Sequence, residues 1–216
     1  MASNDMDTMF RYKMSINPAT IHQIGKIAEL HKQVLTSGFL SRLDTAILGK
    51  LYKLILKEGI LLAAVTDDSS LAGFVSFSHD TKKLMRMFVK SSPDIYLRLF
   101  ITYLRHPSFV LRSLETMLAP FKHGNNNKGI RNIPASELLS IVVNPAVQHT
   151  GTGTALLQKL EGELKKRKIY SYKVVAGEQL ISANRFYQKN EFLLTDRIRI
   201  HGKTMSNVFV KSLSID

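Results

Sequence analysis

Two glycines stand one residue apart in the sequence QHTGTGT (148–154), a spacing that is typical of loops that hold phosphate. A strand-like run, ELLSIVV (137–143), precedes the loop, and a helix-like run, ALLQKLEGELKKRK (155–168), follows it. The first amides of a helix have no acceptor within the helix, so they can bind a pyrophosphate. Glycine lets the phosphates approach the backbone because it carries no side chain. The sequence therefore predicts a phosphate site where this helix begins.

Two familiar phosphate loops do not fit the sequence. A Walker A loop needs Lys and then Ser or Thr after its last glycine, whereas Gly153 is followed by Thr154 and Ala155. A dinucleotide-binding loop needs a third glycine where Leu156 stands, and it follows its strand without the intervening residues 144–150. The remaining pattern is Gln-x-x-Gly-x-Gly at the start of a helix, and the alternative is a tight turn without a ligand.

This pattern resembles the GCN5-related N-acetyltransferase (GNAT) superfamily. The match runs from Glu137 to Leu157, ELLSIVVNPAVQHTGTGTALL, and a second block, SANRFYQKNEF (182–192), is similar to the family's Ala-x-x-Phe-Tyr-x-x-x-Gly-Phe. The second block departs from the family at Glu191, where glycine is usual, and at Leu180, where asparagine is common. We expect Asn190 to provide the left-handed helix cap in place of that glycine.

The resemblance implies acetyl-CoA or a longer acyl-CoA as the acyl donor. It implies that the amides of the strand over Ile141, Val142 and Val143 bind the thioester carbonyl and the pantetheine, and that Asn184 bonds the pantetheine arm. The residues expected around the pyrophosphate are Gln148, His149, Thr150, Gly151, Thr152, Gly153 and Thr154.

The same resemblance assigns the proton transfers. Tyr187 matches the family's general acid for the departing sulfur, although a buried helix tyrosine is the alternative. Glu137 stands where some members carry a general base that acts through water, or it is a solvent-facing residue at the start of a strand. His79, at the end of SLAGFVSFSH, is the rival base, and its alternative is a structural histidine. The chain has no cysteine, so direct attack of an amine in a ternary complex is the simplest scheme.

The elements around these residues predict an α/β (α+β) fold. Strands are expected at 10–16, 59–67, 70–78, 137–143, 171–177, 192–200 and 204–212, with helices from about residue 18, at 41–57, 81–121, 151–167 and 182–190. This order gives a mixed sheet with helices on both faces. The resemblance adds that the sheet is mostly antiparallel, and that 1–216 is one acyltransferase domain with a helical insert at about 81–131 before the CoA-binding strand.

The charge and composition restrict the partners. The net charge of the chain is +13. The segment from Thr81 to Arg131 contains ten basic and two acidic residues, so its own net charge is +8. Such a balance favours anionic partners. The chain shows no signal-peptide core and no apolar run long enough to span a bilayer, so the sequence predicts a soluble cytoplasmic protein without membrane insertion. No metal site is expected.

The acceptor is predicted from the segments before the motif strand. The residues IAELH (27–31), SGFLSRL (37–43) and LY (51–52) resemble the GNAT branch that acylates nucleotide-linked amino sugars for bacterial surface polysaccharides. That resemblance implies an amino dideoxy sugar on dTDP or UDP. One rival is a GNAT acting on a protein N-terminus, a lysine or a small amine. The other is a non-catalytic nucleic-acid-binding module, for which the aromatic residues look too interior. A homodimer is left open.

Overall fold

The computed structural model describes residues 14–36, 40–91, 133–201 and 204–214. Within these ranges the elements are β1 (Met14–Pro18), η1 (Ile21–Gln23), α2 (Ile24–Val34), η2 (Leu40–Arg42), α3 (Thr45–Glu58), β2 (Ile60–Thr66), β3 (Leu71–Ser78), α4 (Thr81–Ser91), β4 (Glu137–Val143), η3 (Pro145–Val147), α7 (Thr152–Lys166), β5 (Ser171–Gly177), α8 (Ile181–Lys189), β6 (Leu193–His201) and β7 (Thr204–Ser212). Apart from α4, the expected helical insert lies outside the described residues. None of the described helices is long and apolar enough to cross a membrane.

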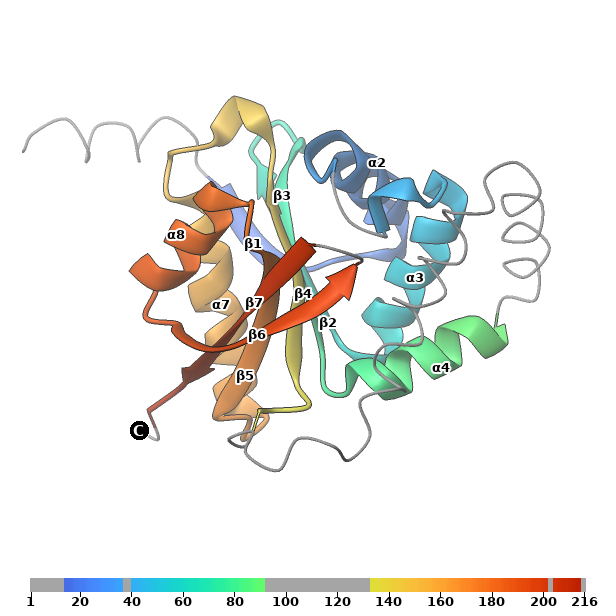
Figure 1. The fold of residues 1–216 in the computed structure, drawn as a ribbon. Coiled ribbons are helices and arrows are strands. Elements are labelled where there is room, and N and C mark those ends of the chain that lie inside the picture. The colour runs from blue at the N-terminus through green and yellow to red at the C-terminus, as the bar shows by residue number, and fades with distance from the viewer. Residues whose placement is uncertain (1–13, 37–39, 92–132, 202–203, 215–216) are drawn as a thin grey trace, which may run out of the picture. The chain divides into compact units, whose positions relative to one another are not determined.

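The strands pair in the order β1-β2-β3-β4-β5-β7-β6 (Figure 1). Strands β4 and β5 are parallel, with Glu137 opposite Lys173 and Leu138 opposite Val174. The pairs β1–β2, β2–β3, β5–β7 and β6–β7 are antiparallel. The prediction of a mixed, mostly antiparallel sheet flanked by helices is therefore confirmed.

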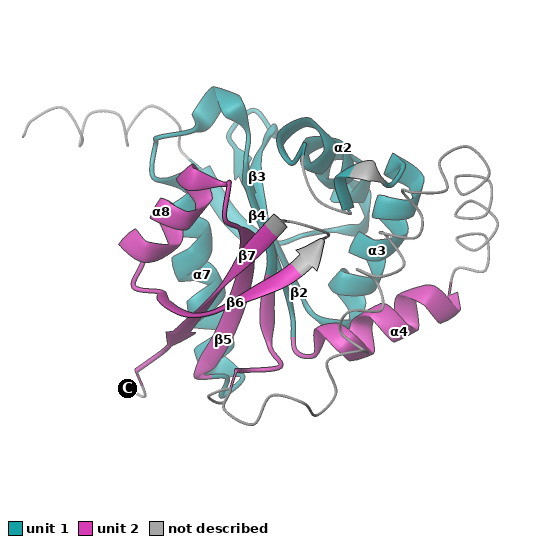
Figure 2. Ribbon diagram, in the orientation of Figure 1, with its two compact units in different colours: residues 1–78, 139–169 teal, residues 79–138, 170–216 magenta. Residues whose placement is uncertain are grey.

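The chain divides into two compact units, shown in Figure 2. Unit 1 comprises residues 1–78 and 139–169, and unit 2 comprises residues 79–138 and 170–216. Strand β4 contributes Glu137 and Leu138 to unit 2 and its remaining residues to unit 1. The single domain expected over 1–216 stays a prediction.

Unit 1 is built on two strands that are buried on both faces. Residues 60–64 of β2 and 72–78 of β3 are all buried, so both faces of this pair must be covered. Tyr52 of α3 packs edge-on against Phe74, with 5.3 Å between the ring centroids. The helix α7 covers the other face of β3, where a Cβ on Gly73 would lie 3.2 Å from Leu156. These helices cover β2 and β3 from both sides.

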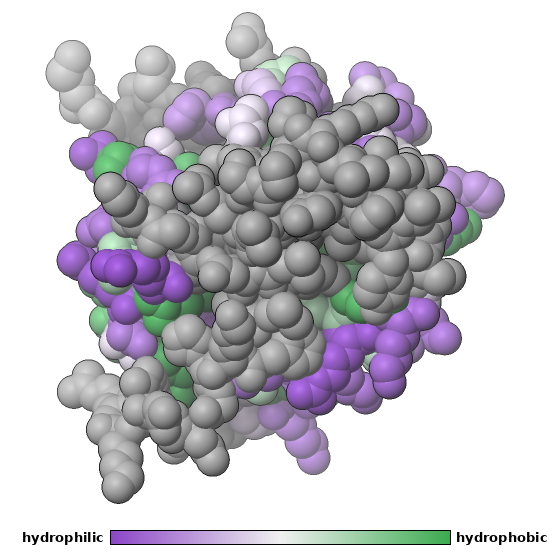
Figure 3. All heavy atoms as spheres, turned by 45° about the vertical axis from the view of Figure 1, so that its right-hand side comes forward, coloured by the Kyte–Doolittle hydropathy of each residue, from purple (hydrophilic) through white to green (hydrophobic). Residues whose placement is uncertain are grey.

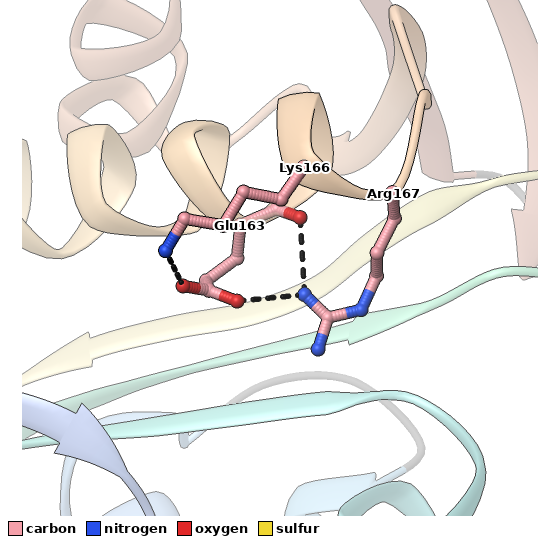
Figure 4. Close-up of polar contacts among 3 residues, drawn as sticks. All are labelled: Glu163, Lys166 and Arg167. Atoms are coloured by element: carbon pink, nitrogen blue, oxygen red, sulfur yellow. Dashed lines mark hydrogen bonds and ion pairs between the residues drawn. The ribbon is translucent and has the colours of Figure 1, made fainter.

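The helices of unit 1 begin and end at residues whose chemistry explains the boundary. The side chain of Asp44 accepts a hydrogen bond from the amide of Ile47 at 2.8 Å, so α3 begins at Thr45, later than the predicted residue 41. At the C-terminal end of α7, the carboxylate of Glu163 accepts hydrogen bonds from Lys166 and Arg167, both at 2.8 Å (Figure 4). Cations in the last turn of α7 also interact favourably with the negative end of the helix.

Unit 2 packs α8 on its sheet through aromatic side chains. Tyr187 of α8 lies with its ring 5.4 Å from that of Phe192 and 5.8 Å from that of Phe209 on β7. The cap after α8 differs from the expectation. Asn190 has a φ of −96°, and Glu191 adopts the left-handed conformation at 65°. The residue that replaces the family's glycine thus keeps the glycine's backbone conformation, and the prediction for Asn190 is wrong.

Candidate active site

The loop before α7 is shaped by its own side chains and by two left-handed residues. Asn144 accepts a hydrogen bond from the amide of Ala146 at 3.0 Å and starts the short helix η3. His149 and Gly151 then take φ values of 64° and 83°. The hydroxyl of Thr150 donates to the carbonyl of Val147 at 2.7 Å and closes the turn. Gly151 is required where it stands, because its conformation is one that other residues rarely adopt.

The result is a series of backbone amides without acceptors. Among the described residues, no acceptor is bonded to any amide from His149 to Thr154, and the first helical bond is that of Ala155 to the carbonyl of Gly151 at 2.9 Å. Successive unpaired amides at a helix start form a site of positive potential for an anion. The predicted phosphate loop therefore has the backbone that such a site needs.

The side chains of this loop serve the loop itself. Gln148 donates from Nε2 to the carbonyl of Val143 at 3.3 Å, and the hydroxyls of Thr150 and Thr152 lie 2.8 Å apart. Gln148 thus joins the loop to the end of β4. The role of these three residues in CoA binding stays a prediction.

The amides of β4 alternate between its two edges. The amide of Asn144 donates to the carbonyl of Ala72 on β3 at 2.8 Å. Because successive amides along a strand point in opposite directions, those of Val143 and Ile141 are directed away from β3, and that of Val142 is directed toward it. Of the three amides predicted to bind the thioester and the pantetheine, those of Ile141 and Val143 therefore have a direction that leaves them free of β3, and that of Val142 does not.

Gly73 lets β3 and β4 approach closely. A Cβ at this position would lie 2.6 Å from the carbonyl oxygen of Val142 and 3.3 Å from the Cα of Val143. Neither atom can move without moving the backbone of β4. Sequence reasoning did not single out Gly73, since a lone glycine within a strand is only a weak signal.

Tyr187 lies in unit 2 on α8 and is buried. Its hydroxyl makes no hydrogen bond to any described residue, and burial raises its pKa above the usual range. The hydroxyl therefore keeps its proton at neutral pH and is free to donate it to a ligand atom.

Asn184 supports the turn between β5 and α8. Its Nδ2 donates to the carbonyls of Gly177 at 2.9 Å and Leu180 at 2.7 Å, and its Oδ1 accepts from Nδ2 of Asn207 at 2.8 Å. The side chain is thus occupied within unit 2. This position favours a supporting role over the expected bond to pantetheine.

Glu137 is also in unit 2, and its carboxylate is neither solvent-facing nor isolated. Oε2 accepts a hydrogen bond from the hydroxyl of Thr81 at 2.9 Å and lies 3.7 Å from Nζ of Lys173. Burial raises the pKa of this carboxyl, while Lys173 and Thr81 oppose the rise. Thr81 and Lys173 are partners that the sequence analysis missed, because they lie 56 and 36 residues away along the chain.

His79 is exposed and stands directly after β3. The two rival bases thus occupy different environments, since Glu137 is half-buried beside a cation and His79 is exposed.

Comparison with known structures identifies the fold. The chain resembles yncA of Salmonella typhimurium, solved with acetyl-CoA, at a TM-score of 0.59 and 16% identity over 94% of this chain and 95% of that one. The chain has the GNAT fold. The chain also resembles the PaiA N-acetyltransferase of Thermoplasma acidophilum in complex with coenzyme A. The TM-score is 0.55 and the sequence identity is 15%, over 93% of this chain and 99% of that one. A third similar structure is the ribosomal-protein-S18-alanine N-acetyltransferase of Escherichia coli. Its TM-score is 0.59 and its sequence identity is 12%, over 94% of this chain and 96% of that one.

The sequence itself matches the family model described as acetyltransferase (GNAT) domain over residues 128–201. No curated protein matches the chain. The matched segment contains β4, the loop of unpaired amides, α7, β5 and α8 with Tyr187. The GNAT match therefore covers the predicted donor loop and the predicted acid, and together with the fold it supports an acyl-CoA-dependent N-acyltransferase.

Proposed function

We propose that this protein transfers an acyl group from acyl-CoA to a primary amine by direct attack. The observation that carries the proposal is the run of unpaired amides from His149 to Thr154 at the start of α7, within the segment that matches the GNAT domain. The pyrophosphate of CoA fits these amides. Structures of similar fold contain acetyl-CoA or coenzyme A, which supports this choice of anion.

The reaction forms a bond between the amine nitrogen and the acyl carbon and breaks the bond from that carbon to sulfur. Negative charge grows on the carbonyl oxygen as the nitrogen attacks. We assign its stabilisation to the outward amides of Ile141 and Val143. The products are the amide and free CoA thiol, with the surplus proton of the amine passed to a base.

Glu137 suits the role of that base better than His79. A base works best when its pKa is near the operating pH, and burial raises the pKa of Glu137 toward that range. Its Oε2 is bonded to Thr81, while Oε1 makes no bond to any described residue. A water on Oε1 would connect the carboxylate to the amine.

Tyr187 is assigned to the departing sulfur. A thiolate is the leaving group, and a nearby hydroxyl that keeps its proton stabilises it by donating a hydrogen bond or the proton itself. The unbonded state of the Tyr187 hydroxyl supports this role, and because burial raises its pKa, the hydroxyl stabilises the thiolate by donating a hydrogen bond rather than by giving up its proton.

For the acceptor we propose an anionic amine, namely an amino dideoxy sugar linked to dTDP or UDP. The support comes from α4, whose exposed side chains include Lys82, Lys83, Arg86 and Lys90, whereas Leu84 and Phe88 are buried. Helix α4 contains no acidic residue. Figure 3 shows hydrophilic surface on the face of the molecule that includes this region. A cationic helix face would compensate the acceptor's diphosphate.

The test is a thiol-release assay with several acyl-CoAs against free and nucleotide-linked amino sugars. Because the chain has no cysteine, a thiol reagent reports only released CoA. We expect turnover with the linked sugars, and a rise of about tenfold in acceptor KM for Lys82→Gln or Lys83→Gln, since a charged hydrogen bond contributes about 1.5–3 kcal/mol. Lys53→Gln, an exposed cation on α3, is the control.

Equal rates with the free sugar would exclude a role for the diphosphate. Turnover only with peptides or simple amines would then replace the proposed acceptor. Absence of thiol release with every acceptor and acyl-CoA would contradict the acyltransferase itself.

A further inference from the structure

A chain of polar side chains crosses the apolar interior of unit 1. Nδ1 of His31 lies 2.6 Å from the hydroxyl of Tyr52, which lies 3.3 Å from Oγ of Ser140. Oγ of Ser140 in turn lies 2.6 Å from Oγ of Ser76. The four side chains are between 0% and 7% exposed. Polar groups so deep in a core are costly unless every one is bonded, so their presence calls for an explanation beyond packing.

None of the four side chains in this network needs to be charged for the hydrogen bonds to form. Burial lowers the pKa of His31 to about 4, so the ring is neutral, and burial raises the pKa of Tyr52, which keeps its proton. One order of donation runs from Ser76 through Ser140 and Tyr52 to Nδ1 of His31. Only the reverse order, in which the Nδ1–H of His31 donates to Tyr52, leaves the hydroxyl of Ser76 able to donate to the Ser140 carbonyl, and this is the order that the proposal requires. The network is thus complete across the neutral pH range.

The polar network ends at the carbonyl of Ser140 on β4, the strand that carries the proposed oxyanion donor, the amide of Ile141. Oγ of Ser76 is 3.4 Å from the carbonyl oxygen of Ser140, and that carbonyl belongs to the peptide group whose N–H is the amide of Ile141. A trans peptide group is planar, so its carbonyl and its N–H point in opposite directions. Fixing the Ser140 carbonyl toward β3 therefore fixes the Ile141 amide toward the opposite edge of β4.

We propose that His31, Tyr52, Ser76 and Ser140 form a positioning network that holds the amide of Ile141 in the direction needed by the thioester oxygen. This inference rests on the proposed function and assigns it four positioning residues that touch no reacting atom. Helices α2 and α3 and strand β3 each supply one member, so the network ties the donor strand to three elements. Hydrogen-bond donors aimed in advance at the developing charge are the most effective kind.

The variants Tyr52→Phe and Ser76→Ala remove one hydroxyl each with little change of shape. Ser78→Ala is the matched control, because Ser78 lies two residues along the same strand, is equally buried, and makes no hydrogen bond to a described residue. The first measurement is the amide resonance of Ile141 in the free protein by NMR. We expect it to move in both network variants and to stay in place in the control.

The second measurement is the infrared band of acetyl-CoA labelled with carbon-13 at the thioester carbonyl. Binding to the wild type should lower the band, and the lowering should be smaller in Tyr52→Phe and Ser76→Ala than in Ser78→Ala. We expect kcat to fall about tenfold with an unchanged acyl-CoA KM, because loss of a whole oxyanion donor costs about 100- to 1000-fold.

The outcomes separate the two hypotheses. A band that is lowered equally in all variants, with an unmoved Ile141 resonance, would overturn the positioning network and leave the acyltransferase intact. Failure of the folded wild type to bind acetyl-CoA would instead overturn the proposed function.

Discussion

His31 should make the stability of this protein depend on pH between neutrality and pH 4. Its pKa is lowered from 6.5 to about 4 by burial, and Lys32 adds to the effect. The unfolded chain therefore binds a proton in a range where the folded chain does not, and stability falls as the pH falls. The full difference of about 2.5 pKa units corresponds to about 3 kcal/mol, of which about 2 kcal/mol is lost between pH 7 and pH 5.

Urea unfolding followed by circular dichroism at pH 7, 6 and 5 measures this loss. The variant His31→Asn retains a polar atom near Nδ1 for Tyr52 but cannot titrate. Its free energy of unfolding should fall about 2 kcal/mol less than that of the wild type over this range, because the contribution of the carboxyl groups cancels in the comparison. The exposed His22→Asn should behave as the wild type. Equal pH dependence in His31→Asn and the wild type would refute the assignment of a buried neutral histidine.

Three further predictions concern the site. Tyr187→Phe should lower kcat about 100-fold, the usual worth of a general acid, while the acyl-CoA KM stays constant, and wild-type turnover would remove the hydroxyl from the mechanism. Glu137→Gln should abolish the acidic limb of the pH–rate profile, and in the wild type this limb should lie at a higher pH than for an ordinary glutamate because burial raises the pKa of this carboxyl. Loss of the limb in His79→Asn instead would identify His79 as the general base. Gly73→Ala should cost about 1–3 kcal/mol in urea unfolding, since its Cβ would meet the Val142 carbonyl at 2.6 Å, and unchanged stability would show that the strands separate freely.

Most of the fold could be predicted because its strands are bounded by clear signals. The runs 137–143 and 171–177 are strands over the residues expected, since each is a short and mostly apolar run that ends at a polar residue or a glycine. The loop before α7 could be predicted as well, because its glycines precede an amphipathic helix. Such features depend on residues that are neighbours in the sequence.

The contacts that could not be predicted join residues far apart in the chain. The bond between Tyr52 and Ser140 spans 88 residues, and nothing local to either residue indicates it. A serine within each of the apolar runs 71–78 and 137–143 was the available signal, since a polar residue on a buried face needs a partner. Glu191 was misjudged because a left-handed glutamate is less common than a left-handed asparagine. The expected cationic positions after Ser91 lie outside the described residues.

Calorimetric titration of coenzyme A into the wild type and Gly153→Val tests the central claim most directly. Gly153 is the suitable position, because it lies in the first turn of α7 without the positive φ of Gly151, so valine can be accommodated by the backbone. The side chain would stand where the pyrophosphate approaches. We predict that affinity for coenzyme A falls at least about tenfold, or about 1.4 kcal/mol, while the melting temperature changes little. Unchanged affinity in the folded variant would contradict the binding of the pyrophosphate by the amides of residues 149–154.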